Sequence, residues 1–208
     1  MKLLALILPT LTMAADSDLG GKKFSATVQF AWNQIEAKTS WTFDRFVKRI
    51  QNYGCHCFPD QGRVPGGSGA PVDAIDSACR DLARCHSCVA MDHSFSGRIS
   101  QEKYRYDLSS GIDCSSNIEQ QKLDQCQCDK KFAEDLGSLW DDAAWDVANW
   151  QTDKNPNRAD YAANGTCATS GIGNVQDMCC GDNPSRRPYN SVNFECCPDG
   201  SIASVGTC

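Results

Sequence analysis

Histidines placed between closely spaced cysteines are the side chains of this sequence best suited to chemistry. They occur in the strings CHC at 55–57 and CHSC at 85–88, and a further pair of cysteines, CQC, stands at 126–128. Thiolates and imidazoles are the usual ligands of zinc, so these clusters fit a metal site. They fit disulfide bonds equally well, since the total of 14 cysteines is even and requires no free thiol.

The start of the chain favours disulfides. Residues 1–15, MKLLALILPTLTMAA, have one lysine, an apolar run and small residues at the end. This order is typical of a secretory signal peptide, and the run is too short to span a bilayer. A buried N-terminal helix is the alternative, but Pro9 interrupts it. We therefore expect a secreted, extracellular protein that begins near Asp16, contains disulfides rather than zinc and has no transmembrane segment.

The charge of the mature chain restricts its partners. It has 19 Lys and Arg (20 less Lys2) against 26 Asp and Glu, a net charge of −7. Because this acidity repels phosphate groups, we expect no nucleic-acid partner and no simple electrostatic docking on anionic lipid. A cationic or calcium-rich partner is compatible with it.

The cysteines fall into two groups, which predicts two structural units. Eight lie between Cys55 and Cys128 and six between Cys167 and Cys208, separated by a polar stretch without periodicity. We expect a first domain at 16–150, a linker at 151–166 and a cysteine-rich C-terminal module at 167–208. The linker contains Asn164-Gly165-Thr166, an acceptor for glycosylation in a secreted chain.

Helical periodicity is clear in the first domain. Apolar residues predict one amphipathic helix at 43–50 and a longer one from Asp73 to Val89. At the start of the longer helix, Asp73 with Asp76 three residues on resembles a capping box. A third helix begins near Asn117 and continues towards Trp150, with Gly137 as a candidate break. The expected fold is mainly α, a disulfide-stapled helical core with little sheet.

Three strings in this helical stretch carry a resemblance to a known family. They are YGCHCF, GGSGAPVDAIDSACRDLARC and CQCDKKFAEDL, in that order. Together they resemble the secreted phospholipase A2 family. Its pattern has Tyr-Gly-Cys-x-Cys, a glycine-rich loop, Pro-x-Asp-x-x-Asp, a Cys-Cys-x-x-His-Asp-x-Cys helix and a facing helix with Cys-x-Cys-Asp. The resemblance covers residues 43–136 and implies the family's helical fold.

The resemblance also implies disulfide pairs. One bridge of the family joins the first Cys of its doublet to the facing helix, and here both ends are replaced, by Ala78 and Asp135. The pairs that the resemblance implies are Cys57–Cys79, Cys85–Cys128 and Cys114–Cys126. Cys55 and Cys88 are then left over and are paired with each other by elimination.

The resemblance fails at the residues that do the family's chemistry. In the family a histidine takes a proton from the water that attacks the phospholipid ester. The next aspartate and loop carbonyls hold calcium, and an aspartate on the facing helix orients the histidine. Here the base falls on Leu82, the calcium carboxylate on Ala83 and the orienting group on Asp129. Leucine cannot accept a proton and alanine cannot ligate a metal, so we expect a catalytically inactive relative without a cofactor.

His86 is a candidate stand-in for the missing base. It lies one helical turn after Leu82 on the same face, in reach of Asp129. The alternative is that His86 only completes a hydrogen bond to Asp129, as the aromatic residue usual at this position of the family does. His56 and His93 form no constellation with a serine or an acid, and we expect them in loops or on the surface.

The stretch that would hold calcium is altered as well. Between Cys57 and Pro71 it is longer than the family's loop, although GGSGAP keeps glycines that allow unusual backbone angles. Calcium takes six to eight oxygen ligands, commonly with a carboxylate among them. A flexible surface loop without calcium is the alternative. The candidate ligands are His56, Phe58, Asp60 and Gly69.

The C-terminal module has two Cys-Cys doublets, at 179–180 and 196–197, flanked by Cys167 and Cys208. Six cysteines predict three bridges in a compact, loop-rich unit that depends on them, with connectivity left open. The module resembles the di-cysteine repeats of galaxin-type extracellular matrix proteins, which implies a matrix or biomineral setting. A disulfide-rich appendage without that role is the alternative.

The expected function is binding without turnover. The candidate partners are a phospholipid or fatty acyl ligand, an extracellular protein, or a mineral matrix. Leu82 and Ala83 should make the floor of the cleft more apolar than in the family, so that an acyl chain still enters. The alternative function is calcium-dependent hydrolysis of phospholipid esters through a noncanonical site that uses His86 and Asp129.

Overall fold

The computed structural model describes residues 12–13, 17–19, 22–24, 26–51, 53–57, 67, 69–96, 99, 102–142, 167 and 176–208. These ranges contain four helices, which confirms a mainly α fold: α1 (Ala26–Ile35), α2 (Phe43–Ile50), α3 (Ala74–Asp92) and α4 (Gln120–Leu139). None of these helices is long and apolar enough to cross a membrane. The expected linker with Asn164, and all but Thr12 and Met13 of the expected signal peptide, lie outside the described residues.

The strands in the described ranges are short and form antiparallel pairs. In the N-terminal half β1 (Thr12–Met13) pairs with β4 (Arg105–Tyr106), and β2 (Ser17–Leu19) with β3 (Lys22–Phe24). In the C-terminal module β5 (Met178–Cys180) pairs with β6 (Arg187–Tyr189), and β7 (Phe194–Cys196) with β8 (Ile202–Ser204).

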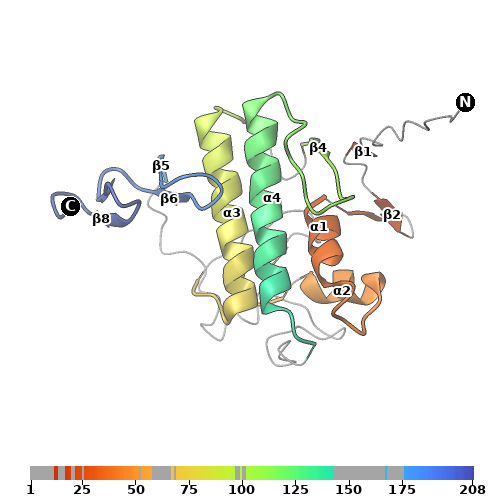
Figure 1. Ribbon diagram of the computed structural model, residues 1–208. Coiled ribbons are helices and arrows are strands. Elements are labelled where there is room, and N and C mark those ends of the chain that lie inside the picture. The colour runs from red at the N-terminus through yellow and green to blue at the C-terminus, as the bar shows by residue number, and fades with distance from the viewer. Residues whose placement is uncertain are drawn as a thin grey trace, which may run out of the picture.

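Helices α3 and α4 lie side by side and form the centre of the molecule (Figure 1). Helices α1 and α2 cover one side of this pair, and the C-terminal module extends from the other, next to α3 (Figure 1). The core between α1, α2 and the pair includes the fully buried side chains of Phe46, Ile50, Phe132 and Leu136. Helix α2 presents the predicted apolar face to it, with Thr42 as its N-cap.

The start of α3 differs from a capping box in one respect. Asp73 is the N-cap, and its carboxylate accepts from the backbone N–H of Asp76 at 2.8 Å. The Asp76 carboxylate does not return the bond. It is fully buried and accepts from the N–H groups of Cys55 (2.9 Å), His56 (2.7 Å) and Val72 (3.0 Å). Asp76 therefore ties the segment before the loop to the first turn of α3.

Gly54 is required by this arrangement. Its φ is +54°, a conformation that side chains with a Cβ rarely adopt. A Cβ at this position would also lie 2.4 Å from Cγ of Asp76. The Tyr-Gly-Cys-x-Cys string thus has glycine where the backbone passes against a buried carboxylate.

Helix α4 continues through Gly137, so a break at this glycine is wrong. The glycine serves the packing of α1 instead, because a Cβ on Gly137 would lie 2.9 Å from Cβ of Gln34. Trp140 caps the end of α4 and packs edge-on against Trp41 and Phe46. The expected continuation at 143–150 lies outside the described residues.

All fourteen cysteines are paired, in seven disulfides. Three bridges coincide with pairs that the family resemblance implies: Cys57–Cys79, Cys85–Cys128 and Cys114–Cys126. The pair Cys55–Cys88 is wrong, because Cys55 bonds Cys167 and Cys88 bonds Cys179. Only two bridges lie within the C-terminal module, so it is not the separate three-bridge unit that we expected: Cys180–Cys196 and Cys197–Cys208.

The geometry of α3 explains why Cys55 and Cys88 do not meet. The bond from Cys55 N–H to Asp76 holds Cys55 beside the first turn of α3. Cys88 is twelve residues after Asp76 on the same helix, which is about 18 Å at 1.5 Å per residue. A disulfide needs Cα atoms within about 7 Å. Each of the two cysteines therefore pairs with the C-terminal part of the chain.

Candidate functional site

Leu82 and Ala83 lie in the middle of α3. Leu82 is 2% exposed and packs in the main apolar core, with Val89 and Phe132 among its members. Ala83 is half-buried. The chain therefore has an apolar side chain in a packed environment where the family pattern has its base.

Asp129, one turn before Phe132 on α4, is 1% exposed and has both carboxylate oxygens occupied. Nε2 of His86 on α3 lies 2.8 Å from Oδ1 and donates to it. The Tyr104 hydroxyl donates to Oδ2 at 2.5 Å. Asp129 thus joins α3, α4 and the segment that leads into β4.

His86 has the geometry of an oriented imidazole. In the neutral imidazole whose Nε2 donates to Asp129, the other ring nitrogen, Nδ1, is an acceptor. Nδ1 is buried and has no hydrogen-bond partner among the described residues. The contact with Asp129 is common to both interpretations of His86, the stand-in base and the structural hydrogen bond.

Tyr104 is a residue of this site that the sequence analysis missed. Burial raises the pKa of the Tyr104 phenol well above its usual range, and the charge and hydrogen bond of Asp129 raise it further. An ionised phenolate here would lie beside the Asp129 carboxylate without solvent to separate the charges. The buried network therefore requires a protonated Tyr104.

A raised folded-state pKa predicts an alkaline loss of stability. The contribution of Tyr104 is fully present below about pH 10, the ordinary tyrosine pKa, and is lost as pH rises through the folded-state value. In Tyr104→Phe we expect this part of the pH dependence to disappear. At neutral pH the variant should lose about 1–3 kcal/mol, because the buried Asp129 Oδ2 lacks a donor.

Denaturant unfolding at neutral and alkaline pH, with tyrosinate absorbance, measures both effects. Tyr189→Phe in the C-terminal module is the matched control, because that phenol does not contact Asp129. Equal alkaline profiles for wild type and Tyr104→Phe would contradict the assignment.

The structure places two of the calcium-ligand candidates against each other. His56 lies in a turn outside the helices, the loop position of the two that we expected, but is only 4% exposed, and its Nε2 donates to the Gly69 carbonyl at 3.1 Å. The other two candidates, Phe58 and Asp60, lie outside the described residues. Within the described ranges, no group of three or more His, Cys, Asp or Glu could hold a metal ion.

The third histidine, His93, is the C-cap of α3. Its Nε2 lies 2.9 Å from Oδ2 of Asp124 on α4, and the ring is partly buried. The contact ties the C-terminal end of α3 to the start of α4. The other carboxylate oxygen of Asp124 accepts from the side-chain amides of Gln120 at 2.7 Å and Asn183 at 3.5 Å.

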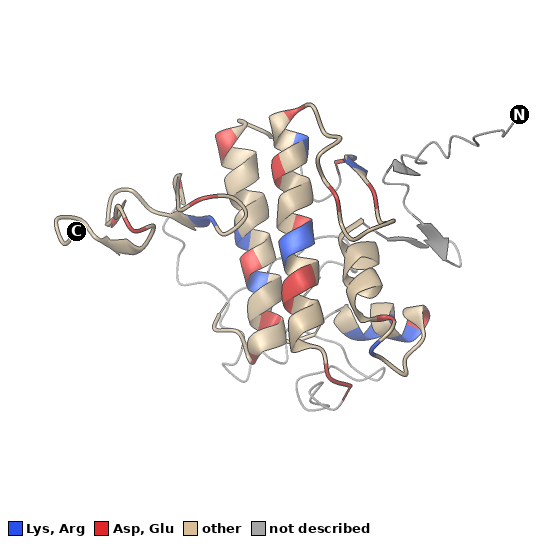
Figure 2. Cartoon of the chain, in the orientation of Figure 1, with Lys and Arg blue, Asp and Glu red and all other residues tan. Residues whose placement is uncertain are grey.

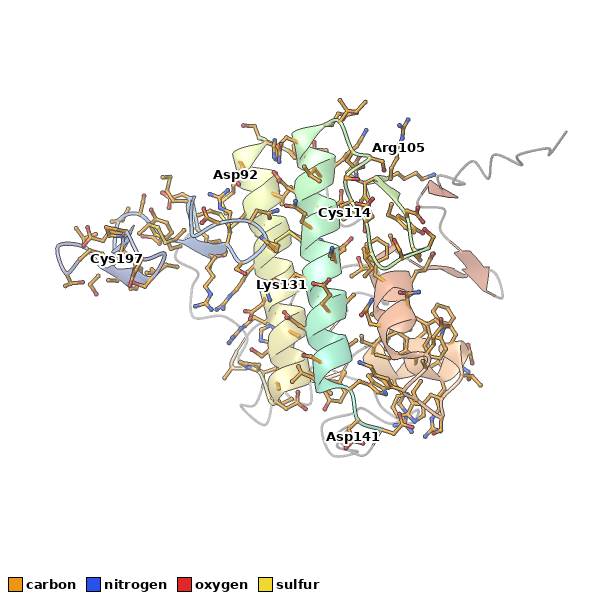
Figure 3. All side chains as sticks on the ribbon, viewed as in Figure 1. Asp92, Arg105, Cys114, Lys131, Asp141 and Cys197 are labelled. Atoms are coloured by element: carbon orange, nitrogen blue, oxygen red, sulfur yellow. A yellow bond between two sulfur atoms is a disulfide. The ribbon has the colours of Figure 1, made fainter. Side chains whose placement is uncertain are left out.

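Leu82 also lines a cavity of about 210 Å³ between α3, α4 and the C-terminal module. Its floor is apolar, with Ala78 and Phe132 beside Leu82, whereas Ala83 is not among its lining residues. The rim is charged and includes Lys131, which Figure 3 labels on the face of α4. The far wall comes from residues 184–187 of the module.

Comparison with known proteins identifies relatives for the helical part of the chain. A profile of the family described as Phospholipase A2 matches residues 31–141. A phospholipase A2 of Calliactis polypus is 30% identical over 138 residues, 65% of this chain and 79% of the relative. Basic phospholipase A2 nigroxin A of Micrurus nigrocinctus is 35% identical over 101 residues, 48% and 79% of the two chains.

A third relative, group IID secretory phospholipase A2 of Mus musculus, is 35% identical over 82 residues, 39% of this chain and 51% of the relative. The profile match includes Leu82, Ala83 and Asp129 and ends before the C-terminal module. The positions to which the resemblance assigns the family's chemistry thus lie inside the matched region, and the far wall of the cavity lies outside it.

Proposed function

Because this chain belongs to the phospholipase A2 family, we propose that it is a secreted member that binds phospholipid without hydrolysing it. The observation that carries the proposal is Leu82 at the position of the family's base, packed in the core at 2% exposure. Ala83, at the position of the calcium carboxylate, supports it. Neither side chain can take a proton or hold a metal.

The size of the expected loss supports binding over catalysis. A general base contributes about 10²–10⁴ in rate. A Lewis-acid metal contributes several kcal/mol of transition-state stabilisation, a further factor of about 10³. Without both, hydrolysis by this centre falls at least about 10⁵-fold below that of an intact family member.

Secretion is supported by the chemistry of the cysteines and by the relatives. Seven disulfides persist only in an oxidising compartment such as the extracellular space. One relative is named as a secretory enzyme. The apolar residues 1–15 are suited to direct the chain there.

The test is release of fatty acid from mixed phospholipid vesicles by the purified protein, with calcium and with chelator. We expect no release above the protein-free blank in either condition, and co-sedimentation of the protein with the vesicles. Calcium-dependent release that survives repurification would contradict the proposal. Failure to co-sediment would remove the lipid as ligand and leave a protein or matrix partner.

A second candidate function is hydrolysis through His86 and Asp129. It is favoured by the 2.8 Å contact between them and by the unpartnered Nδ1 of His86. If release is observed, His86→Ala should abolish it, whereas His93→Ala, which removes the imidazole paired with Asp124, should retain it. A fully active His86→Ala variant would rule this route out.

A further inference from the structure

The cavity beside Leu82 combines an apolar floor with a charged rim. Ala78, Leu82 and Phe132 form the floor together with the Cys85–Cys128 bridge. Ala78 and Asp135 both line it, at the two positions where the family pattern would place a disulfide. The space therefore lies where two cysteines have been replaced and where the C-terminal module closes over the helix pair.

Most of the charged side chains on the rim of the cavity are paired with a group of opposite charge. Each of the two lining carboxylates has a cation beside it: Asp81 lies 3.2 Å from Arg84, and Asp135 lies 2.8 Å from Lys131. The lining Arg186 is paired as well, with Asp92.

Arg187 is different from these paired groups. It lines the cavity from β6 and has no carboxylate at ion-pair distance among the described residues. The rim therefore carries one positive charge that the described part of the protein does not neutralise.

Neighbouring arginines add to this positive potential. Burial lowers the pKa of Arg84, and the nearby charge of Arg80 lowers it further, with a smaller effect of Arg187. Nε of Arg80 and Nε of Arg186 are buried without a hydrogen-bond partner among the described residues. Figure 2 shows blue segments on β6 and on the adjacent turns of α3, where a red segment lies between them. This concentration contrasts with the net charge of −6 of the whole chain.

We propose that this cavity binds a short-chain fatty acid, with its carboxylate at Arg187 and its alkyl chain over Leu82 and Phe132. Arginine presents parallel N–H donors that match a carboxylate. An apolar cavity of about 150 Å³ holds benzene, so about 210 Å³ accommodates roughly eight non-hydrogen atoms. Hexanoate has this size. A phospholipid's esterified chains carry no carboxylate, so the ligand is a free acid.

This site is independent of the proposed function. Its far wall comes from the C-terminal module, which lies outside the stretch that matches the family. Binding of a free acid requires neither hydrolysis nor attachment to a membrane. Loss of vesicle binding and loss of hexanoate binding are therefore separate results.

Isothermal titration and ligand-observed NMR of the full, oxidised chain test the site with three probes. Hexanoate has the charge and the chain, hexan-1-ol only the chain, and acetate only the charge. We expect hexanoate to bind with a dissociation constant of about 1 mM or tighter. Hexan-1-ol and acetate should each bind at least tenfold more weakly. Equal binding of hexanoate and hexan-1-ol, or no binding of hexanoate, would overturn the proposal.

Two variants locate the binding. Arg187→Gln should weaken hexanoate at least fivefold, and Ala78→Leu, which fills the floor, should do the same. The matched control is Arg105→Gln on β4, which Figure 3 labels on the other side of α4 from the module, and it should bind as wild type. Thermal unfolding of each variant checks the fold. Unchanged affinity in a folded Arg187→Gln protein would overturn the assignment.

Discussion

Replacing Cys88 and Cys179 together with alanine should lower the free energy of unfolding by about 3 kcal/mol. The two residues are 91 apart in sequence, but the other bridges shorten the loop that they close. The path runs twelve residues from Cys179 to Cys167, two from Cys55 to Cys57 and nine from Cys79 to Cys88. A cross-link over such a loop removes about 3 kcal/mol of chain entropy from the unfolded state.

The Cys55–Cys167 bridge belongs to the same closed path, so removing it alone should have a similar effect. When one of the two bridges is already absent, the other closes a much longer loop, which runs back to Cys128 on α4. Removing this second bridge should lower the free energy of unfolding by about a further 4 kcal/mol. The combined loss thus exceeds twice the loss from either pair. Denaturant unfolding without reductant measures the three values.

Hydrogen exchange supplies the control for this experiment. Only the variant without both bridges between the helical core and the C-terminal module, Cys55–Cys167 and Cys88–Cys179, should expose α3 amides, because the module then no longer covers that helix. Removal of the Cys197–Cys208 bridge, which lies within the module, should leave α3 protected. A loss below about 1 kcal/mol for Cys88→Ala/Cys179→Ala would show that the module is held by its other contacts.

Replacing Asp76 with alanine should destabilise the protein by at least about 3 kcal/mol. The carboxylate accepts from three backbone N–H groups, two of which belong to buried residues, Cys55 and His56. An unsatisfied buried donor costs about 1–3 kcal/mol, and hydrogen bonds to a charged group lie at the upper end of the usual range. Denaturant unfolding at neutral pH measures the loss.

Asp76→Asn and Asp44→Ala are the comparisons for this prediction. Asparagine keeps one carbonyl acceptor and should lose less than alanine. Asp44 is exposed in an i,i+4 pair with Lys48, so its removal should change stability by no more than about 0.5 kcal/mol. If Asp76→Ala were as stable as Asp44→Ala, the carboxylate would not hold the loop to α3.

The sequence predicts the helix pair well because its apolar spacing and its cysteine strings are local signals. Helix α1 was missed, although Val28, Ala31 and Ile35 repeat at helical spacing, because Thr27 and Trp32 blur the pattern. The pairing of Cys55 with Cys88 was wrong because elimination treated the eight N-terminal cysteines as a closed set. The length of α3 between the two residues was the signal against it.

The candidate site also has a part that the sequence predicts and a part that it does not. The contact between His86 and Asp129 follows from a one-turn spacing on α3 and a family pattern, so sequence is enough to predict it. Tyr104 reaches Asp129 from a segment without regular periodicity, and no spacing rule connects them. The cavity depends on how the C-terminal module packs on α3, which is a tertiary contact between segments far apart in the chain.

The two bridges between the core and the C-terminal module also set an order for biosynthesis. A chain emerges with its N-terminal part first, so α3 can fold while the thiols of Cys55 and Cys88 still lack their partners. Those partners, Cys167 and Cys179, are made later. A chain interrupted before them would keep two thiols without their native partners. Native pairing of Cys55 therefore requires that synthesis has passed residue 167, and native pairing of Cys88 that it has passed residue 179.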